Sequence, residues 1–204
     1  MGAGDEVGAS LAEIGYDVTY IDRNNIDNLD LGQFDAIVFG IMAFNNNEFI
    51  GNYSDRFMTY MNNGGNLILQ YNNMRIGMKS DLIMPYPIEF SGNSARVRVS
   101  EEDAEVSLLM PDHPALNKPN DITEKDFDGW IQERGLYFPV KWDDKYSALV
   151  SSHDTGEEPL KGGILVAEFG KGHYVYTPLS WFRQLPAGVP GAFRIFANLI
   201  SLGR

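Results

Sequence analysis

The chain has 204 residues, of which 44% are hydrophobic and 22% are charged, and its formal net charge at pH 7 is −12. This composition is typical of a globular protein, and the length suits one domain covering residues 1–204. The absence of cysteine excludes disulfide bonds, cysteine-ligated metal centres and a cysteine nucleophile. The acidic charge and the lack of any run of Lys or Arg argue against nucleic acid as a partner.

No apolar stretch approaches the roughly 20 residues that a membrane-spanning helix needs. The first residues, Met1 to Glu6, also lack the basic and apolar regions of a signal peptide. We therefore expect neither a membrane span nor a leader within this sequence.

The first elements follow an α/β pattern. Asp5 suits the N-cap of a helix, and Val7, Leu11 and Ile14 recur at helical spacing before Gly15. The alternating, β-branched stretch that follows predicts a strand at 16–21.

Further elements continue this pattern toward the middle of the chain. The apolar run at 34–40 predicts a strand buried on both faces, as in a parallel sheet. A helix with Phe49, Tyr53, Phe57 and Met61 on one face and a strand at 66–71 come next. Helices that alternate with strands across short connections are typical of an α/β fold.

A doubly wound sheet normally begins with a strand that leads into the first Gly-rich turn. Here that turn stands at residues 2–5, with no strand before it. The sequence therefore predicts a fragment of a longer protein that lacks its first strand.

The second half reads differently, because short strands and turns replace the α/β alternation. Residues 85–90 and 95–99 predict an antiparallel hairpin around 91–93, and a long polar loop spans 112–128. Pro190 suits the first turn of a closing helix. Further strands are predicted at 106–110, 146–151, 163–169 and 173–177, the last two joined by a Gly-Lys-Gly turn.

Ligands in open α/β sheets bind beyond the carboxyl ends of the strands. This rule selects candidate segments at 2–5, 43–45, 71–73, 112–113 and 181–184. The 2–5 loop could hold an anion at the helix start, but a tight turn with a capping Asp5 is favoured. His113 follows Asp112, although neighbouring side chains in an extended chain point apart.

Two further features leave alternatives open. Trp130 lies among carboxylates and amides, an arrangement found both at sugar-binding surfaces and around core tryptophans. Arg183 lies between apolar residues, where it could clamp a carboxylate or hold a loop carbonyl. No Gly-x-Ser-x-Gly elbow, P-loop or His-Glu-x-x-His motif occurs.

Four segments stand in an order that resembles a known family, namely 64–72, 111–114, 170–177 and 182–192. They resemble the C-terminal domain that follows the catalytic domain in long PIG-L/LmbE-type deacetylases. That domain is similar to the class I glutamine amidotransferase-like fold, including the trehalose-utilisation-type branch. The resemblance implies a flavodoxin-like three-layer α/β sandwich with an antiparallel β extension.

The catalytic residues of the related families do not carry over. Amidotransferases place their cysteine after the strand equivalent to 67–71, where this chain reads Tyr71, Asn72 and Asn73. The deacetylase zinc motif, His-Pro-Asp-Asp, is also missing. The resemblance thus implies a non-catalytic accessory domain without metal or cofactor. It further implies a periplasmic or secreted parent protein whose catalytic deacetylase domain is this domain's partner.

The sequence hypothesis is that this accessory domain binds a ligand, with a carbohydrate as the candidate, or docks onto the catalytic domain. The expected ligand-binding residues are Phe44, Asn45, Tyr71, Asn72, His113 and Arg183. The alternative is a small-sugar hydrolase or isomerase that uses His113 with Asp112 or Glu133 as acid–base groups.

Overall fold

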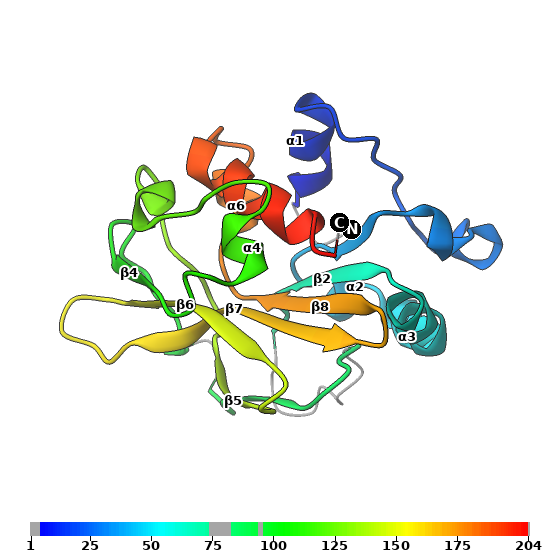
Figure 1. Ribbon diagram of the computed structural model, residues 1–204. Helices are drawn as coiled ribbons and strands as arrows, with labels where there is room; N and C mark the ends of the chain where they lie inside the picture. Colours follow the sequence, from blue (N-terminus) through cyan, green and yellow to red (C-terminus); the bar gives the residue numbers. More distant parts are fainter. Residues whose placement is uncertain (1–4, 74–82, 94–95, 204) are drawn as a thin grey trace.

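The computed structural model describes residues 5–73, 83–93 and 96–203 and has a mixed α/β architecture (Figure 1). Its helices are α1 (Val7–Glu13), α2 (Ala43–Asn46), α3 (Ser54–Asn62), α4 (Pro114–Asn117), α5 (Trp181–Gln184) and α6 (Pro190–Ile200). Its strands are β1 (Ala36–Phe39), β2 (Asn66–Gln70), β3 (Ile88–Phe90), β4 (Glu105–Leu108), β5 (Pro139–Trp142), β6 (Ser147–His153), β7 (Leu160–Phe169) and β8 (Gly172–Thr177). Short 3-10 helices span Ile26–Asn28, Leu31–Gln33, Glu48–Tyr53 and Glu124–Phe127.

A six-stranded mixed sheet in the order β1-β2-β8-β7-β6-β4 forms the centre of the fold. β1, β2 and β8 run parallel, with Ala36 opposite Asn66 and Asn66 opposite His173. From β8 onward each strand is antiparallel to its neighbour. The predicted α/β class and the antiparallel extension are both present.

The sheet separates two layers of core, because successive side chains of a strand point to opposite faces. Val38, Ile68 and Val175 belong to the layer that contains α1 and α6. Their sequence neighbours Leu67 and Tyr174 belong to the layer that contains α3. β2 is buried along its whole length, as its near-continuous apolar sequence predicts for a central strand.

One predicted strand pairing is wrong. β3 does not pair with 95–99 but with β5, in a separate two-stranded sheet. Val99 instead forms an isolated bridge with Gly135, and residue 95 lies outside the described residues. The Phe90 ring packs against Tyr176 of β8 at a centroid distance of 5.3 Å. This long-range contact packs the end of β3 against the main sheet, so tertiary contacts rather than a local turn select its partner.

Residues 16–21, which the sequence predicts as a strand, do not form one. Residues 17–21 make no backbone–backbone hydrogen bond to any described residue. Yet Tyr16 and Val18 pack against one core layer and Ile21 against the other. The segment therefore keeps the alternation of a strand without a partner to form a ladder.

Candidate functional site

The turns after β1 and β2 are tied together at the carboxyl edge of the sheet. The Phe44 backbone amide donates to Asn72 Oδ1 at 2.9 Å, and Asn72 Nδ2 donates to the Gln70 carbonyl at 3.1 Å. Asn45 and Asn73 exchange two further hydrogen bonds between side chain and backbone. Asn72 is fully buried; its Oδ1 positions the Phe44 turn, and its Nδ2 holds the side chain against the end of β2.

Tyr71 lies between this frame and the segment that follows β8. Its ring is 5.3 Å from the Tyr137 ring and 6.1 Å, edge-on, from the Phe182 ring. Only 3% of Tyr71 is exposed. Burial, reinforced by the negative charge of Glu133, raises the pKa of the Tyr71 hydroxyl well above its ordinary value. The hydroxyl is therefore a neutral hydrogen-bonding group at any physiological pH.

An ion pair lies beside these rings. Arg183 Nε donates to Glu133 Oε1 at 2.9 Å, and the Ser180 hydroxyl donates to the same oxygen at 3.3 Å. A second guanidinium nitrogen of Arg183 bonds to Gln132 Oε1. The Arg183 guanidinium also stacks over the Phe182 ring, 4.8 Å from its centroid. The Arg183 side chain is 32% exposed and that of Glu133 is 15% exposed, so the pair borders solvent.

A buried glutamine holds the loop that carries Gln132 and Glu133. Gln184 is fully buried; its Oε1 accepts from the Ile131 amide and its Nε2 donates to the Ile131 carbonyl, each at 2.9 Å. This pair imitates a step of a β-ladder. It therefore fixes the 131–133 loop against α5, the helix that contains Arg183.

Residues with a strained backbone lie at the same edge. Among the described residues, the non-glycine positions with a left-handed backbone are Met42 (φ 55°), Gln132 (φ 66°) and Tyr137 (φ 60°). Each contacts a residue of the cluster formed by Tyr71, Phe182, Arg183 and Glu133. Met42 bonds to the Tyr71 carbonyl, Gln132 bonds to Arg183, and Tyr137 packs on Tyr71. Such strained positions in folded proteins concentrate at functional sites.

The structure brings most of the expected site residues to this edge. Phe44, Asn45, Tyr71 and Asn72 follow β1 and β2, and Arg183 follows β8. His113 lies elsewhere. Its Nδ1 accepts from the Ala115 amide at 3.1 Å, which caps α4.

One of the groups that act on the pKa of His113 is His173, which lies near the amino end of β8. Burial lowers the pKa of His113, and the positive charge of His173 lowers it further. His173 is the second residue of β8 and lies opposite Asn66, the first residue of β2. His113 is thus assigned to the amino edge, whereas Glu133 pairs with Arg183 after the carboxyl end of β8. The acid–base alternative of His113 with Asp112 or Glu133 stays a prediction.

Some members of the cluster gave no signal in the sequence. Tyr137 follows an isolated bridge rather than a recognisable strand, and its left-handed backbone is invisible in the residue pattern. Trp130, considered for sugar stacking, is a core residue: it is 3% exposed and its ring packs 5.3 Å from Trp181. Residues 2–4 of the proposed anion loop lie outside the described residues.

Two general properties bear on the chemistry of the site. In the described ranges, no three His, Asp or Glu side chains are grouped as metal ligands. None of the helices in those ranges is long and apolar enough to cross a membrane.

No protein-family model matches the sequence, and no curated protein shows significant similarity to it. Solved structures do share its fold. The cytoplasmic protein STM3548 from Salmonella typhimurium aligns with a TM-score of 0.58 and 16% identity, covering 95% of this chain and 84% of that one. The cytoplasmic protein STM1381 from Salmonella typhimurium LT2 aligns with a TM-score of 0.58 and 12% identity, covering 98% and 86%.

A cold-adapted β-galactosidase from Rahnella sp. R3 also contains a similar fold, with a TM-score of 0.50 and 15% identity. The match covers 87% of this chain but 24% of that enzyme. At these identities the comparisons define the class of architecture, a mixed α/β domain, and nothing about activity.

Proposed function

We propose that this domain is a non-catalytic module that binds a carbohydrate at the carboxyl edge of its parallel strands. The observation that carries the proposal is the contact of the half-buried Phe182 ring with Arg183 and with the buried Tyr71 ring, beside the Glu133–Arg183 pair and strained backbone. Sites for small ligands combine apolar rings with a few convergent polar groups, as this edge does.

The polar groups of the cluster can form hydrogen bonds with the hydroxyl groups of a sugar. A hydroxyl both donates and accepts, a carboxylate accepts, and a guanidinium donates along a planar fork. Glu133 and Arg183 already satisfy each other and border solvent, so they can exchange water for sugar hydroxyls without exposing a buried charge. The half-buried Phe182 ring adds the apolar surface against which the carbon–hydrogen face of a pyranose packs.

Two lines of support come from outside the site. A domain of similar fold forms part of a β-galactosidase, an enzyme named for a sugar substrate, although this likeness is at the level of fold only. The resemblance of the sequence to the domain after the catalytic region of PIG-L/LmbE-type deacetylases supports an accessory role. On that reading the fold is flavodoxin-like and related to class I glutamine amidotransferases, and the domain docks onto a catalytic deacetylase domain.

Isothermal titration tests the proposal directly. The probes are glucosamine, N-acetylglucosamine and galactose, with the di- and trisaccharides of each. We expect saturable heat with at least one series, and a loss of about tenfold in affinity for Tyr71→Phe, which removes one hydroxyl and leaves the ring. Arg183→Met removes both the ion pair and the planar donors, and we expect a larger loss.

The matched control is Tyr174→Phe on β8. Tyr174 is fully buried, and its hydroxyl has no hydrogen-bond partner among the described residues. The same chemical change there leaves sugar binding unaltered if the Tyr71 site is the binding site. Absence of heat with all the probes, or equal losses for the two Tyr→Phe variants, would contradict the proposal.

A further inference from the structure

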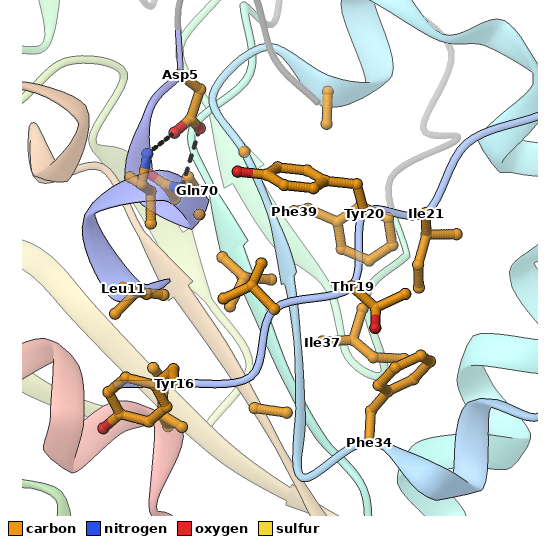
Figure 2. A pocket seen from close by; sticks show the side chains of 18 of the residues that line it. Asp5, Leu11, Tyr16, Thr19, Tyr20, Ile21, Phe34, Ile37, Phe39 and Gln70 are labelled. Atoms are coloured by element: carbon orange, nitrogen blue, oxygen red, sulfur yellow. Dashed lines mark hydrogen bonds between the residues drawn. The ribbon is translucent and has the colours of Figure 1, made fainter. Parts of the chain in front are cut away.

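A groove of about 410 Å³ runs along the outer edge of β1 (Figure 2). One wall is α1, which contributes Val7 and Leu11, and the floor is β1 with Ile37 and Phe39. The opposite wall is the segment 16–21. Figure 2 shows Thr19, Tyr20 and Ile21 of this segment around the groove, together with Ile37 and Phe39 of β1. The groove therefore separates the edge of the sheet from a segment with strand-like side-chain alternation.

The edge of β1 that faces the groove lacks a strand. Within the described ranges β1 pairs with β2 alone, so one row of its peptide groups has no ladder partner. An open edge of this kind is a template for another strand. On the far side of the groove, residues 17–21 also have no backbone–backbone hydrogen bond to a described residue. Both walls thus offer peptide groups that a strand between them would satisfy.

We propose that this groove is the place of one further β-strand, parallel to β1 and joined covalently to the amino end of the chain. This strand would pair with β1 on one side and with 16–21 on the other. With α1 it would complete a strand–helix–strand unit, the usual connection between parallel strands.

The position of Asp5 sets the direction and the connection of the strand. Asp5 Oδ2 accepts from the Ile41 amide at 2.7 Å, just beyond the carboxyl end of β1, and Oδ1 accepts from Val7 at the start of α1. Asp5 therefore lies at the carboxyl end of the groove. A strand that ends close to Asp5 and lies in the groove would run parallel to β1, as β2 does.

A buried acceptor at the same end of the groove has no partner. Gln70 lines the groove, and its Nε2 lies 3.3 Å from Asp5 Oδ2 (Figure 2). Gln70 is fully buried, and its Oε1 accepts no hydrogen bond from any described residue. Buried acceptors in native proteins are rarely left unsatisfied. A backbone amide near the carboxyl end of an inserted strand is a suitable donor for it.

The lining also restricts the chemistry of the strand. Asp5, Asp17 and Asp35 are the charged residues of the groove, and its described lining contains no Lys or Arg. An anionic ligand such as a nucleotide is therefore disfavoured, whereas an uncharged strand fits. Because both faces of the adjacent sheet are buried, we infer a strand rich in Val and Ile.

Extension of the chain tests this proposal. A six-residue segment of Val, Ile and Thr is fused directly before residue 1, and a Gly-Ser segment of equal length serves as the matched control. Hydrogen exchange of the amides in 16–21 and 36–39 and the thermal midpoint are measured for the unextended chain and for both fusions. We expect the Val-Ile fusion to slow exchange in both segments at least about tenfold and to raise the midpoint by about 5 °C or more.

The Gly-Ser fusion should behave as the unextended chain does. Equal exchange in the two fusions would overturn the proposal. So would an unextended chain that already forms a dimer with slow exchange in both segments, because a second copy would then fill the groove. If the Val-Ile fusion precipitates, the same six-residue peptide is added to the unextended chain and the same two segments are compared. Unchanged exchange in that arm overturns the proposal, and slowed exchange supports the strand site.

Discussion

The backbone amide of Met42 donates a hydrogen bond of 3.0 Å to the carbonyl of Tyr71. This bond crosses from the turn after β1 to the turn after β2, and Met42 adopts a left-handed backbone to make it. The Phe44–Asn72 bond repeats the connection two residues later. The edge that carries the proposed sugar site is thus held in place by hydrogen bonds of the backbone and of asparagine side chains.

Backbone strain at Gln132 can be measured by comparing two substitutions. Gln132→Gly and Gln132→Ala both remove the contact with Arg183, but only glycine adopts φ 66° without a steric cost. We expect the Gly variant to be more stable than the Ala variant by about 1 kcal/mol. Urea unfolding of the two variants gives this difference directly. Equal midpoints would mean that the left-handed backbone at Gln132 carries no strain.

Arg134 is a buried cation that organises loop carbonyls. Its Nε and Nη2 donate to the Ala104 carbonyl at 3.2 and 2.8 Å, and Nη1 donates to the Phe127 carbonyl. Burial lowers the pKa of its guanidinium, with partial compensation from nearby carboxylates. Arg134→Met should lower the free energy of unfolding by about 2–4 kcal/mol, because these carbonyls lose their donors.

The control for Arg134 is Arg23→Met at an exposed position. An exposed substitution of this kind should change the unfolding free energy by less than about 0.5 kcal/mol. Both variants are compared by urea unfolding monitored through tryptophan fluorescence. Similar effects of the two substitutions would show that the Arg134 contacts contribute little net stability.

Asn198 on α6 fastens the loop that contains α4. Its Nδ2 donates to the carbonyls of Ala115 and Asn120 at 3.1 and 2.7 Å, and its Oδ1 accepts from the Asn120 amide at 2.9 Å. Because Asn198 is fully buried, Asn198→Leu should lower the unfolding free energy by about 2–4 kcal/mol. Thermal unfolding measures the loss, and Asn28→Leu at an exposed position is the control. A comparable loss for Asn28→Leu would refute the expectation.

The stability of the fold should fall as the pH drops from 7 to 5. Burial lowers the pKa of both His113 and His173 in the folded state, with Glu168 opposing the shift at each. Below the ordinary histidine pKa of about 6.5, the unfolded chain therefore binds protons that the folded chain resists. Stability from these groups is present above that pH and is lost as the pH falls toward the folded pKa values.

His113→Asn isolates one of the two histidines. Asparagine keeps an acceptor at the N-cap of α4 but does not titrate. We expect unfolding midpoints measured between pH 7 and pH 5 to decline less steeply for His113→Asn than for the unsubstituted chain. A double variant with His173→Gln should be flatter still, and parallel curves for all three proteins would exclude the histidine pair as the cause.

Several elements were predictable because their sequence pattern and their tertiary role agree. β2 and the hairpin of β7 and β8 fall where the apolar runs and the Gly-Lys-Gly turn place them. Pro190 begins α6, as its fixed backbone angle favours at a first helical turn. The α/β class follows from these local signals alone.

The candidate site was only partly predictable. The strand-end rule identified Tyr71 and Arg183, because it depends on chain order and parallel pairing. It also selected His113, which the structure places at the other edge. Nothing in the sequence states that Gln184 mimics a ladder step to hold Glu133 or that Tyr137 turns left-handed beside Tyr71.

By itself the sequence determined the periodicity of its elements, the apolar faces they bury and the absence of cysteine chemistry. Residues 16–21 mark the limit of that information. Their alternation encodes a strand, but a ladder requires a neighbouring strand about 4.8 Å away, and a groove lies between this segment and β1. Which segments pair, as β3 with β5, was decided by the tertiary structure, because pairing depends on contacts between residues far apart in the chain.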